Sequence, residues 1–109
     1  MEKKLLPLFK GYNYATTTYS PLEGGMLTGK YVDNVPEDSR MAVDFWKQFY
    51  YHPYMNENSK EKTIKMLKGL KAISKELDCS MAVLSLAWCL KFRGVTSLII
   101  GASRPSQLE

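Results

Sequence analysis

A chain of 109 residues is long enough for one small domain and too short for two. Its hydrophobic content of 45% and charged content of 24% are ordinary for a soluble globular protein, and no apolar run approaches the roughly 18 residues of a membrane span. The net charge of +4 arises largely on one predicted helix, where lysines alternate with apolar residues. This pattern favours a solvated helix face over a nucleic-acid surface, and a few positive groups near an anionic cofactor fit equally well. We expect a cytoplasmic protein without membrane insertion.

The cysteine and histidine content gives no sign of a metal site. Cys79 and Cys89 lie ten positions apart, without a second cysteine pair or a histidine at ligand spacing. We interpret both as reduced thiols in or near helices. His52 is the sole histidine, and a surface loop position is favoured over a catalytic one.

The first elements predicted along the chain are a short helix and a strand. Residues 2–10 are typical of the last turns of a helix, which Gly11 would stop in a left-handed conformation. Residues 14–19 are rich in β-branched and aromatic residues and carry no charge, which indicates a buried strand. Pro21 cannot donate to a strand ladder, so the strand should end before it.

The loop after this strand is built from small residues. Three glycines between residues 24 and 29 let the backbone turn tightly and approach a ligand without a Cβ atom in the way. Ser20, Thr28 and Lys30 supply hydroxyl groups and one positive charge around them. A strand that ends in such a loop is where α/β proteins hold phosphates.

The connection from Val32 to Asn58 lacks sustained periodicity. Within it, residues 41–51 are compatible with a short helix that carries Phe45, Trp46 and Phe49 on one side. A connection of this length in a compact domain is usually a functional loop or lid, and an insertion packed on the surface fits the composition about as well.

Two helices follow. Ser59 is placed to cap the first, which should run to about Leu77. Its apolar residues recur three and four positions apart on one face: Ile64, Leu67, Leu70, Ile73 and Leu77. After a break at residues 78–79, Ser80 is placed to cap a second helix, which Gly94 should stop. That helix, over residues 81–93, is apolar almost all round and should be buried against a sheet or partner helices.

The last segment predicts a second strand and the start of another helix. Residues 96–100 are typical of a short buried strand, and Ser103 is placed to cap a helix that Pro105 begins. Two strands separated by helices imply a parallel pair with a crossover. Because two strands cannot cover the apolar helix, we expect part of a larger α/β protein, incomplete as a domain.

Two runs of sequence resemble a known family. The first is Ser-Pro-Leu, then Gly-Gly and Leu-Thr-Gly-Lys-Tyr, over residues 20–31. The second is Leu-Ala-Trp-Cys-Leu at 86–90, with Gly-Val-Thr-Ser at 94–97 and Ile-Ile-Gly-Ala-Ser at 99–103. Together they resemble the aldo-keto reductases, and fit best the branch that contains the potassium-channel β subunits. The resemblance implies a (β/α)₈ TIM barrel, of which residues 1–109 would be the C-terminal segment, with strands seven and eight and their connecting helices.

The resemblance also implies NADP(H) as the cofactor. TIM barrels frequently bind phosphate in the loops after strands seven and eight. By resemblance to the family, Ser20, Pro21 and Leu22 would line the pyrophosphate and ribose. Thr28 and Lys30 would help to close over the cofactor.

The remaining implied contacts lie further along the chain. Arg40, Ser103 and Gln107 would gather near the adenosine 2′-phosphate, and Gly101 would permit close backbone approach. Glu23 departs from the family pattern, because a small neutral residue usually stands there. A carboxylate beside phosphates is unfavourable unless it points away.

The implied function is an NADP(H)-binding segment of an enzyme that reduces small carbonyl substrates by hydride transfer when the full barrel is present. The Tyr, Lys, Asp and His that the family uses belong to earlier strands, so no catalytic residue is assigned and the question of enzyme activity stays open. One alternative is a non-catalytic, cofactor-binding accessory subunit of a potassium channel. Another is an inactive truncated remnant. Assembly as a homo-oligomer or a channel subunit is compatible with the resemblance.

Overall fold

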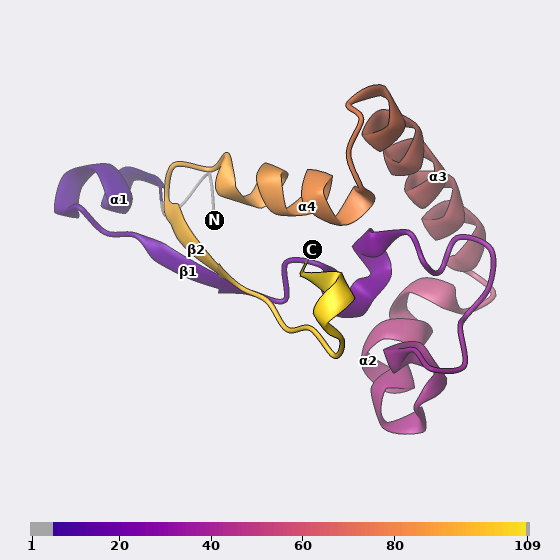
Figure 1. Cartoon of the computed structure of the whole chain (residues 1–109). Coiled ribbons are helices and arrows are strands. Elements are labelled where there is room, and N and C mark those ends of the chain that lie inside the picture. The colour runs from indigo at the N-terminus through magenta and orange to yellow at the C-terminus, as the bar shows by residue number, and fades with distance from the viewer. Residues whose placement is uncertain (1–5, 109) are drawn as a thin grey trace. The chain divides into compact units, whose positions relative to one another are not determined.

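The computed structural model describes residues 6–108 and divides the chain into two compact units. The terminal unit contains the residues up to 21 and those from 86 onward, and the central unit contains residues 22–85. Figure 1 labels the principal helices and both strands. The elements in chain order are α1 (Leu6–Tyr12), β1 (Thr16–Tyr19), η1 (Glu23–Thr28), η2 (Arg40–Ala42), α2 (Asp44–Met55), α3 (Lys60–Glu76), α4 (Met81–Leu90), β2 (Val95–Ile99) and η3 (Pro105–Gln107), where η denotes a 3₁₀ helix.

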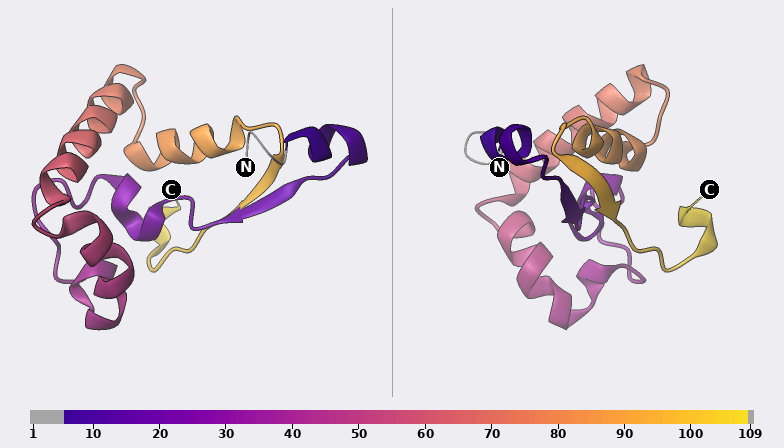
Figure 2. Two further views of the ribbon diagram at one scale, coloured as in Figure 1. Left: turned by 180° about the vertical axis from the view of Figure 1, so that it is seen from behind. Right: turned by 90° about the vertical axis from the view of Figure 1, so that its left-hand side faces the viewer.

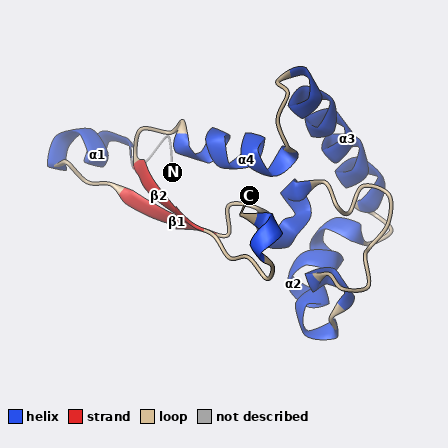
Figure 3. Ribbon diagram, in the orientation of Figure 1, coloured by secondary structure: helices blue, strands red, loops and turns tan. Residues whose placement is uncertain are grey.

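The two strands of the terminal unit form a parallel pair, as the sequence predicts (Figures 2 and 3). The register pairs Thr17 with Ser97 and Tyr19 with Ile99. At the start of the ladder, the Thr16 amide and hydroxyl both donate to the Gly94 carbonyl, at 2.7 and 2.8 Å. Because the two strands are parallel, the loops that follow β1 and β2 leave the pair at the same end.

The predicted burial of these strands is wrong for the chain as described. Tyr19 exposes 78% of its surface and Ile99 exposes 58%. The reason is that no third strand lies beside this pair among residues 6–108. A composition rich in β-branched and aromatic residues indicates that a segment can join a sheet, but not that neighbouring strands are present.

The N-terminal helix ends later than predicted. α1 continues through Gly11 to Tyr12, and Asn13 takes the left-handed conformation with φ of 54°. Asparagine tolerates this conformation better than most non-glycine residues, so it can terminate a helix in place of glycine. The part of the prediction that concerns residues 2–5 lies outside the described residues.

Gly94 has a different role from the predicted helix stop. α4 ends at Leu90, four residues before Gly94, which is buried. A Cβ atom at Gly94 would collide with the Phe9 ring, which packs edge-on against Phe92 with ring centroids 6.3 Å apart. Close packing of side chains, and not a left-handed turn, requires glycine here.

The central unit has a hydrophobic core rich in methionine. Its seven buried apolar residues come from η1, η2, α2, α3, α4 and the loop after η1: Met26, Tyr31, Val32, Met41, Met55, Leu67 and Met81. Unbranched methionine side chains fill irregular gaps between short, irregular elements. The long connection of residues 32–58 is thus part of a packed core through Met41 and Met55.

α2 is longer than predicted and is helical where a loop was expected. The prediction ends at residue 51, whereas the helix continues through Pro53 to Met55, with exposed His52 in its last turn. A proline disfavours helical conformation in the residue before it. Here the burial of Met55, which is only 5% exposed, opposes that preference. The predicted aromatic side is confirmed, with the Phe45 and Trp46 rings 4.9 Å apart.

α3 agrees closely with its prediction except at its cap. The Ser59 side chain makes no capping hydrogen bond. Instead, the Asn56 Oδ1 accepts from the amides of Asn58 and Ser59 at 2.9 and 3.0 Å. Leu67 is fully buried, whereas Leu77 exposes 60%, so the apolar face is not covered along its whole length.

α4 begins as predicted, because the Ser80 hydroxyl accepts from the Val83 amide at 3.1 Å. Its predicted burial is wrong for this chain: Trp88 exposes 71% and Leu90 50%. An apolar helix needs a covering surface, and the described residues supply only two strands. Within residues 6–108, no helix has both the length and the apolar character to cross a membrane.

Candidate functional site

The loop that contains η1 follows a backbone path that glycine adopts at low cost. Gly24, Gly25 and Gly29 have φ of 62°, 97° and 85°, all in the left-handed region. The amides of Gly25 and Leu27 both donate to the Leu22 carbonyl, at 3.0 and 3.2 Å. These bonds close the tight turn that the glycines predict. We call residues 22–30 the glycine loop.

Glu23 also lies in the left-handed region, with φ of 47°. Its side chain is hydrogen-bonded to a residue of α2. The Tyr54 hydroxyl donates to Glu23 Oε1 at 3.1 Å. Burial raises the pKa of Tyr54, and the hydrogen bond to Glu23 and its negative charge raise it further. The carboxylate that departs from the family pattern is therefore directed to α2.

Tyr50 supplies a second contact between α2 and the glycine loop. A Cβ atom at Gly24 would lie 2.5 Å from Cε1 of the Tyr50 ring, a distance that real Cβ atoms do not show. Gly24 thus meets two demands at once, a left-handed backbone and the absence of a side chain. α2 and the glycine loop are joined by both packing and a hydrogen bond.

Thr28 and Lys30 shape the end of the same loop. The Thr28 hydroxyl donates to the Gly25 carbonyl at 2.7 Å. The Lys30 ammonium folds back over the loop, where it lies 5.1 Å from the Tyr31 ring centroid. A Cβ atom at Gly25 would be only 2.9 Å from Lys30 Nζ. One positive charge is therefore held against the backbone at Gly25.

Arg40 lies on the aromatic side of α2. Its Cζ is 4.9 Å from the Trp46 ring centroid and 5.9 Å from that of Tyr50. Beside it, Ser39 is 5% exposed and its hydroxyl has no hydrogen-bond partner among the described residues. A buried hydroxyl without a partner is costly, so this atom has unused hydrogen-bonding capacity.

The terminal unit holds the other predicted residues. Ser20 follows β1 directly, with φ of 52°, and Gly101 follows β2 with open space where a Cβ would lie. Ser103 does not cap a helix, because the residue before the 3₁₀ turn is Arg104. Instead, Gln107 Oε1 accepts from the Ser103 amide at 2.8 Å, the Ser103 hydroxyl at 3.3 Å and the Arg104 amide at 3.3 Å.

The chain was compared with known proteins. The model of the aldo/keto reductase family matches residues 1–109. This chain belongs to the aldo/keto reductase family. A probable voltage-gated potassium channel subunit beta of Oryza sativa subsp. japonica is 39% identical over 109 residues, which cover 99% of this chain and 32% of the relative. A protein of the same name from Arabidopsis thaliana is 37% identical over 110 residues, covering 100% of this chain and 32% of the relative. The chain spans about a third of the length of the curated relatives it matches.

In this aldo/keto reductase chain, each unit brings together part of the predicted set. The central unit joins Leu22, Thr28 and Lys30 in one loop and places the Arg40 guanidinium against α2, the helix that contacts this loop. The terminal unit joins Ser103 and Gln107 by hydrogen bonds and places Ser20, Pro21 and Gly101 in the segments that follow the paired strands. The roles of these residues toward a cofactor stay predictions.

Sequence reasoning missed four residues around these loops. Three of them lie on α2 and contact either Arg40 or Glu23: Trp46, Tyr50 and Tyr54. Their four-residue spacing is the signal that could have identified them as one helix face. Arg104 lies between Ser103 and Pro105, and it is the only cation in the sequence after Arg93.

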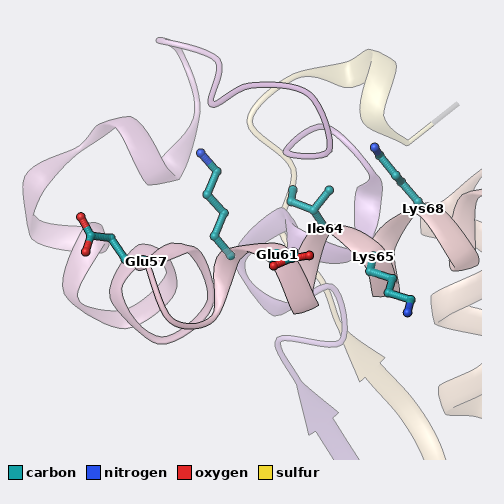
Figure 4. A pocket seen from close by; sticks show the side chains of 6 residues that line it. Glu57, Glu61, Ile64, Lys65 and Lys68 are labelled. Carbon is teal, nitrogen blue, oxygen red and sulfur yellow. The ribbon is translucent and has the colours of Figure 1, made fainter.

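The hollow of about 430 Å³ beside α3 contains none of the predicted residues. It is lined by Glu57, Lys60, Glu61, Ile64, Lys65 and Lys68. Figure 4 shows Ile64 and Lys68 pointing to one side of the helix and Lys65 to the other. Side chains of both signs on an exposed helix are typical of a solvated surface, in agreement with the expectation for these lysines.

Proposed function

We propose that residues 1–109 form the C-terminal segment of an aldo-keto reductase barrel, in which β1 and β2 are strands seven and eight. Three findings support this assignment: the parallel pairing, the helices between the strands, and the family match along the chain. In barrels of this kind the loops after strands seven and eight frequently form a phosphate site. Here they are residues 20–40, which include the glycine loop, and residues 101–107.

We further propose that these loops bind NADP(H). The residues fit a phosphorylated dinucleotide, because the loop has a left-handed glycine backbone and Lys30 holds an ammonium group against Gly25. Arg40 is exposed and its guanidinium lies over two rings of α2, which leaves its N–H groups suited to a phosphate group. The Arg40 guanidinium held over these rings is the observation that carries the proposal.

Different residues of these loops are assigned to different parts of the cofactor. Ser20, Pro21 and Leu22 hold the pyrophosphate and ribose, and Thr28 and Lys30 close over them. Gly101 allows close backbone approach. The residues assigned to the adenosine 2′-phosphate are Arg40, Ser103 and Gln107.

The chemistry of such a cofactor is hydride transfer to a carbonyl carbon. The residues of this chain bind and orient the cofactor, and none of them is assigned to proton transfer. We therefore propose that carbonyl reduction requires the complete barrel, with a small carbonyl compound as substrate.

A second candidate function is an accessory subunit of a voltage-gated potassium channel. The names of the rice and Arabidopsis relatives favour it. Both candidates use the same cofactor loops, so cofactor binding supports either one. Association with a channel would have to be measured on the complete protein.

The proposal is tested in a complete barrel, in which residues 1–109 replace the matching third of the rice relative. Arg40→Ala should weaken NADPH binding roughly ten- to hundredfold, the value of one charge-assisted contact to phosphate, and leave NADH binding nearly unchanged. Calorimetric titration of both cofactors measures this, with Arg93→Ala as the matched control outside the loops. Equal losses for both cofactors would remove Arg40 from the 2′-phosphate site.

A further inference from the structure

Arg40 is supported by two aromatic rings that the proposed function does not assign. Trp46 and Tyr50 are four residues apart on α2, with ring centroids 6.1 Å apart, and both are half-buried. The Arg40 guanidinium lies over both rings, at 4.9 and 5.9 Å from their centroids. We call Trp46 and Tyr50 the aromatic platform.

Tyr50 connects the platform to the glycine loop as well. Its ring occupies the space that a side chain at Gly24 would need, with Cε1 2.5 Å from the Cβ position. The same ring therefore contacts Arg40 on one element and the glycine loop on another. A change in the position of Tyr50 would alter the placement of the guanidinium relative to this loop.

The geometry of a guanidinium allows it to use a ring and a phosphate together. Its flat face stacks on aromatic rings, whereas its N–H groups point outward in the plane and can bind phosphate oxygens in a bidentate manner. An arginine without such support is spread over many rotamers and must lose that freedom when it binds. A platform beneath the guanidinium removes part of this loss in advance.

We propose that Trp46 and Tyr50 are positioning residues that set the preference for NADPH over NADH by holding Arg40 toward the 2′-phosphate. This inference rests on the proposed function. NADH lacks the 2′-phosphate, so its binding should not depend on how Arg40 is held. The platform residues act through Arg40 and are not expected to touch the reacting atoms.

The test uses the same complete barrel and calorimetric titration of both cofactors. Trp46→Ala and Tyr50→Ala should each weaken NADPH binding about three- to tenfold with NADH unchanged, which is the range expected for loss of a cation–π contact. Tyr50→Phe, which keeps the ring, should stay within about twofold of the parent protein. His52→Ala is the matched control, because it removes an exposed ring of the same helix that packs on Tyr51 and not on the platform.

A pair of substitutions at one position keeps the test valid if an alanine variant does not fold. Trp46→Phe retains a ring under Arg40, whereas Trp46→Leu fills the space without one. The first should keep the NADPH preference and the second should lose it. In the double variant Arg40→Ala/Trp46→Leu, the second change should cost nothing further, because both changes remove one interaction.

The outcomes separate this inference from the function on which it rests. A parent protein without NADPH preference, or an Arg40→Ala variant that loses both cofactors equally, contradicts the proposed function. A selective loss in Arg40→Ala together with unchanged selectivity in Trp46→Leu and Tyr50→Ala overturns the platform alone. Equal loss of NADPH and NADH in the platform variants also overturns it, since that result indicates a general structural role.

Discussion

The Tyr54 hydroxyl donates a hydrogen bond of 3.1 Å to the Glu23 carboxylate, across 31 positions of sequence. Glu23 stands in a loop whose backbone is left-handed at three successive residues, from 23 to 25. A non-glycine residue in this conformation costs about 1–2 kcal/mol. The bond to α2 and the packing of Tyr50 on Gly24 hold the strained turn in place.

Removal of the Tyr54 hydroxyl should loosen this turn. In the complete barrel, Tyr54→Phe should lower the free energy of unfolding by about 1–2 kcal/mol, because the Glu23 carboxylate loses a half-buried donor. Denaturation by urea, followed by circular dichroism, measures the change. Tyr51→Phe is the matched control on the same helix, since its hydroxyl makes no hydrogen bond among the described residues. Equal effects of the two substitutions would show that the bond to Glu23 contributes no stability.

Burial of the Tyr54 hydroxyl, together with its bond to Glu23, predicts a dependence of stability on alkaline pH. The folded protein raises the pKa of Tyr54 above its ordinary value of 10.0, so the folded state keeps this proton at a pH where the unfolded state releases it. Stability from this group is therefore full below pH 10 and falls as pH rises toward the folded pKa. Unfolding measured at pH 9 to 11 should show a smaller decline for Tyr54→Phe than for the parent protein. An identical decline in both proteins would contradict the assignment.

Two glycines of the central unit should respond oppositely to the same substitution. Gly24→Ala meets both an unfavourable φ of 62° and the Tyr50 ring, and should destabilise the complete barrel by about 1–3 kcal/mol. Gly69→Ala lies in α3 with nothing within 4 Å of the new atom, and should stabilise it by about 0.5–1 kcal/mol. Urea denaturation of both variants tests the comparison. A neutral Gly24→Ala would indicate that the turn is not held in this conformation.

Substitution of Lys30 should show which phosphate of the cofactor its ammonium group binds. If Lys30 binds the pyrophosphate, Lys30→Ala should weaken NADPH and NADH together, by roughly tenfold or more. If it reaches the 2′-phosphate, only NADPH should weaken. Its position against the Gly25 backbone favours the first result. Lys47→Ala is the control, because Lys47 is paired with Asp44 at 2.6 Å. Unchanged binding of both cofactors in Lys30→Ala would exclude Lys30 from the site.

Local sequence patterns were enough to predict several helices and strands. The apolar periodicity of α3 placed that helix within a residue of its ends, and Ser80 identified the start of α4. The density of β-branched residues located both strands, and the helices between them implied their parallel pairing. The glycine loop was also predictable. Each of these features depends on backbone hydrogen bonding and side-chain preference within a few residues, which is the information that a sequence window contains.

Tertiary contacts decided the features that the sequence left open or placed wrongly. α2 passes Pro53 because Met55 enters the core, and Gly94 is needed because Phe9 packs against it. The direction of the Glu23 carboxylate and the support beneath Arg40 both depend on α2. The burial of α4 could not be predicted from its composition alone, because an apolar surface favours burial but does not show whether another element covers it. The amino-acid sequence by itself therefore determined the elements and the residues of the candidate loops. Only the packing of those elements decided which side chains hold the loops in place, because such contacts join residues that are distant in sequence.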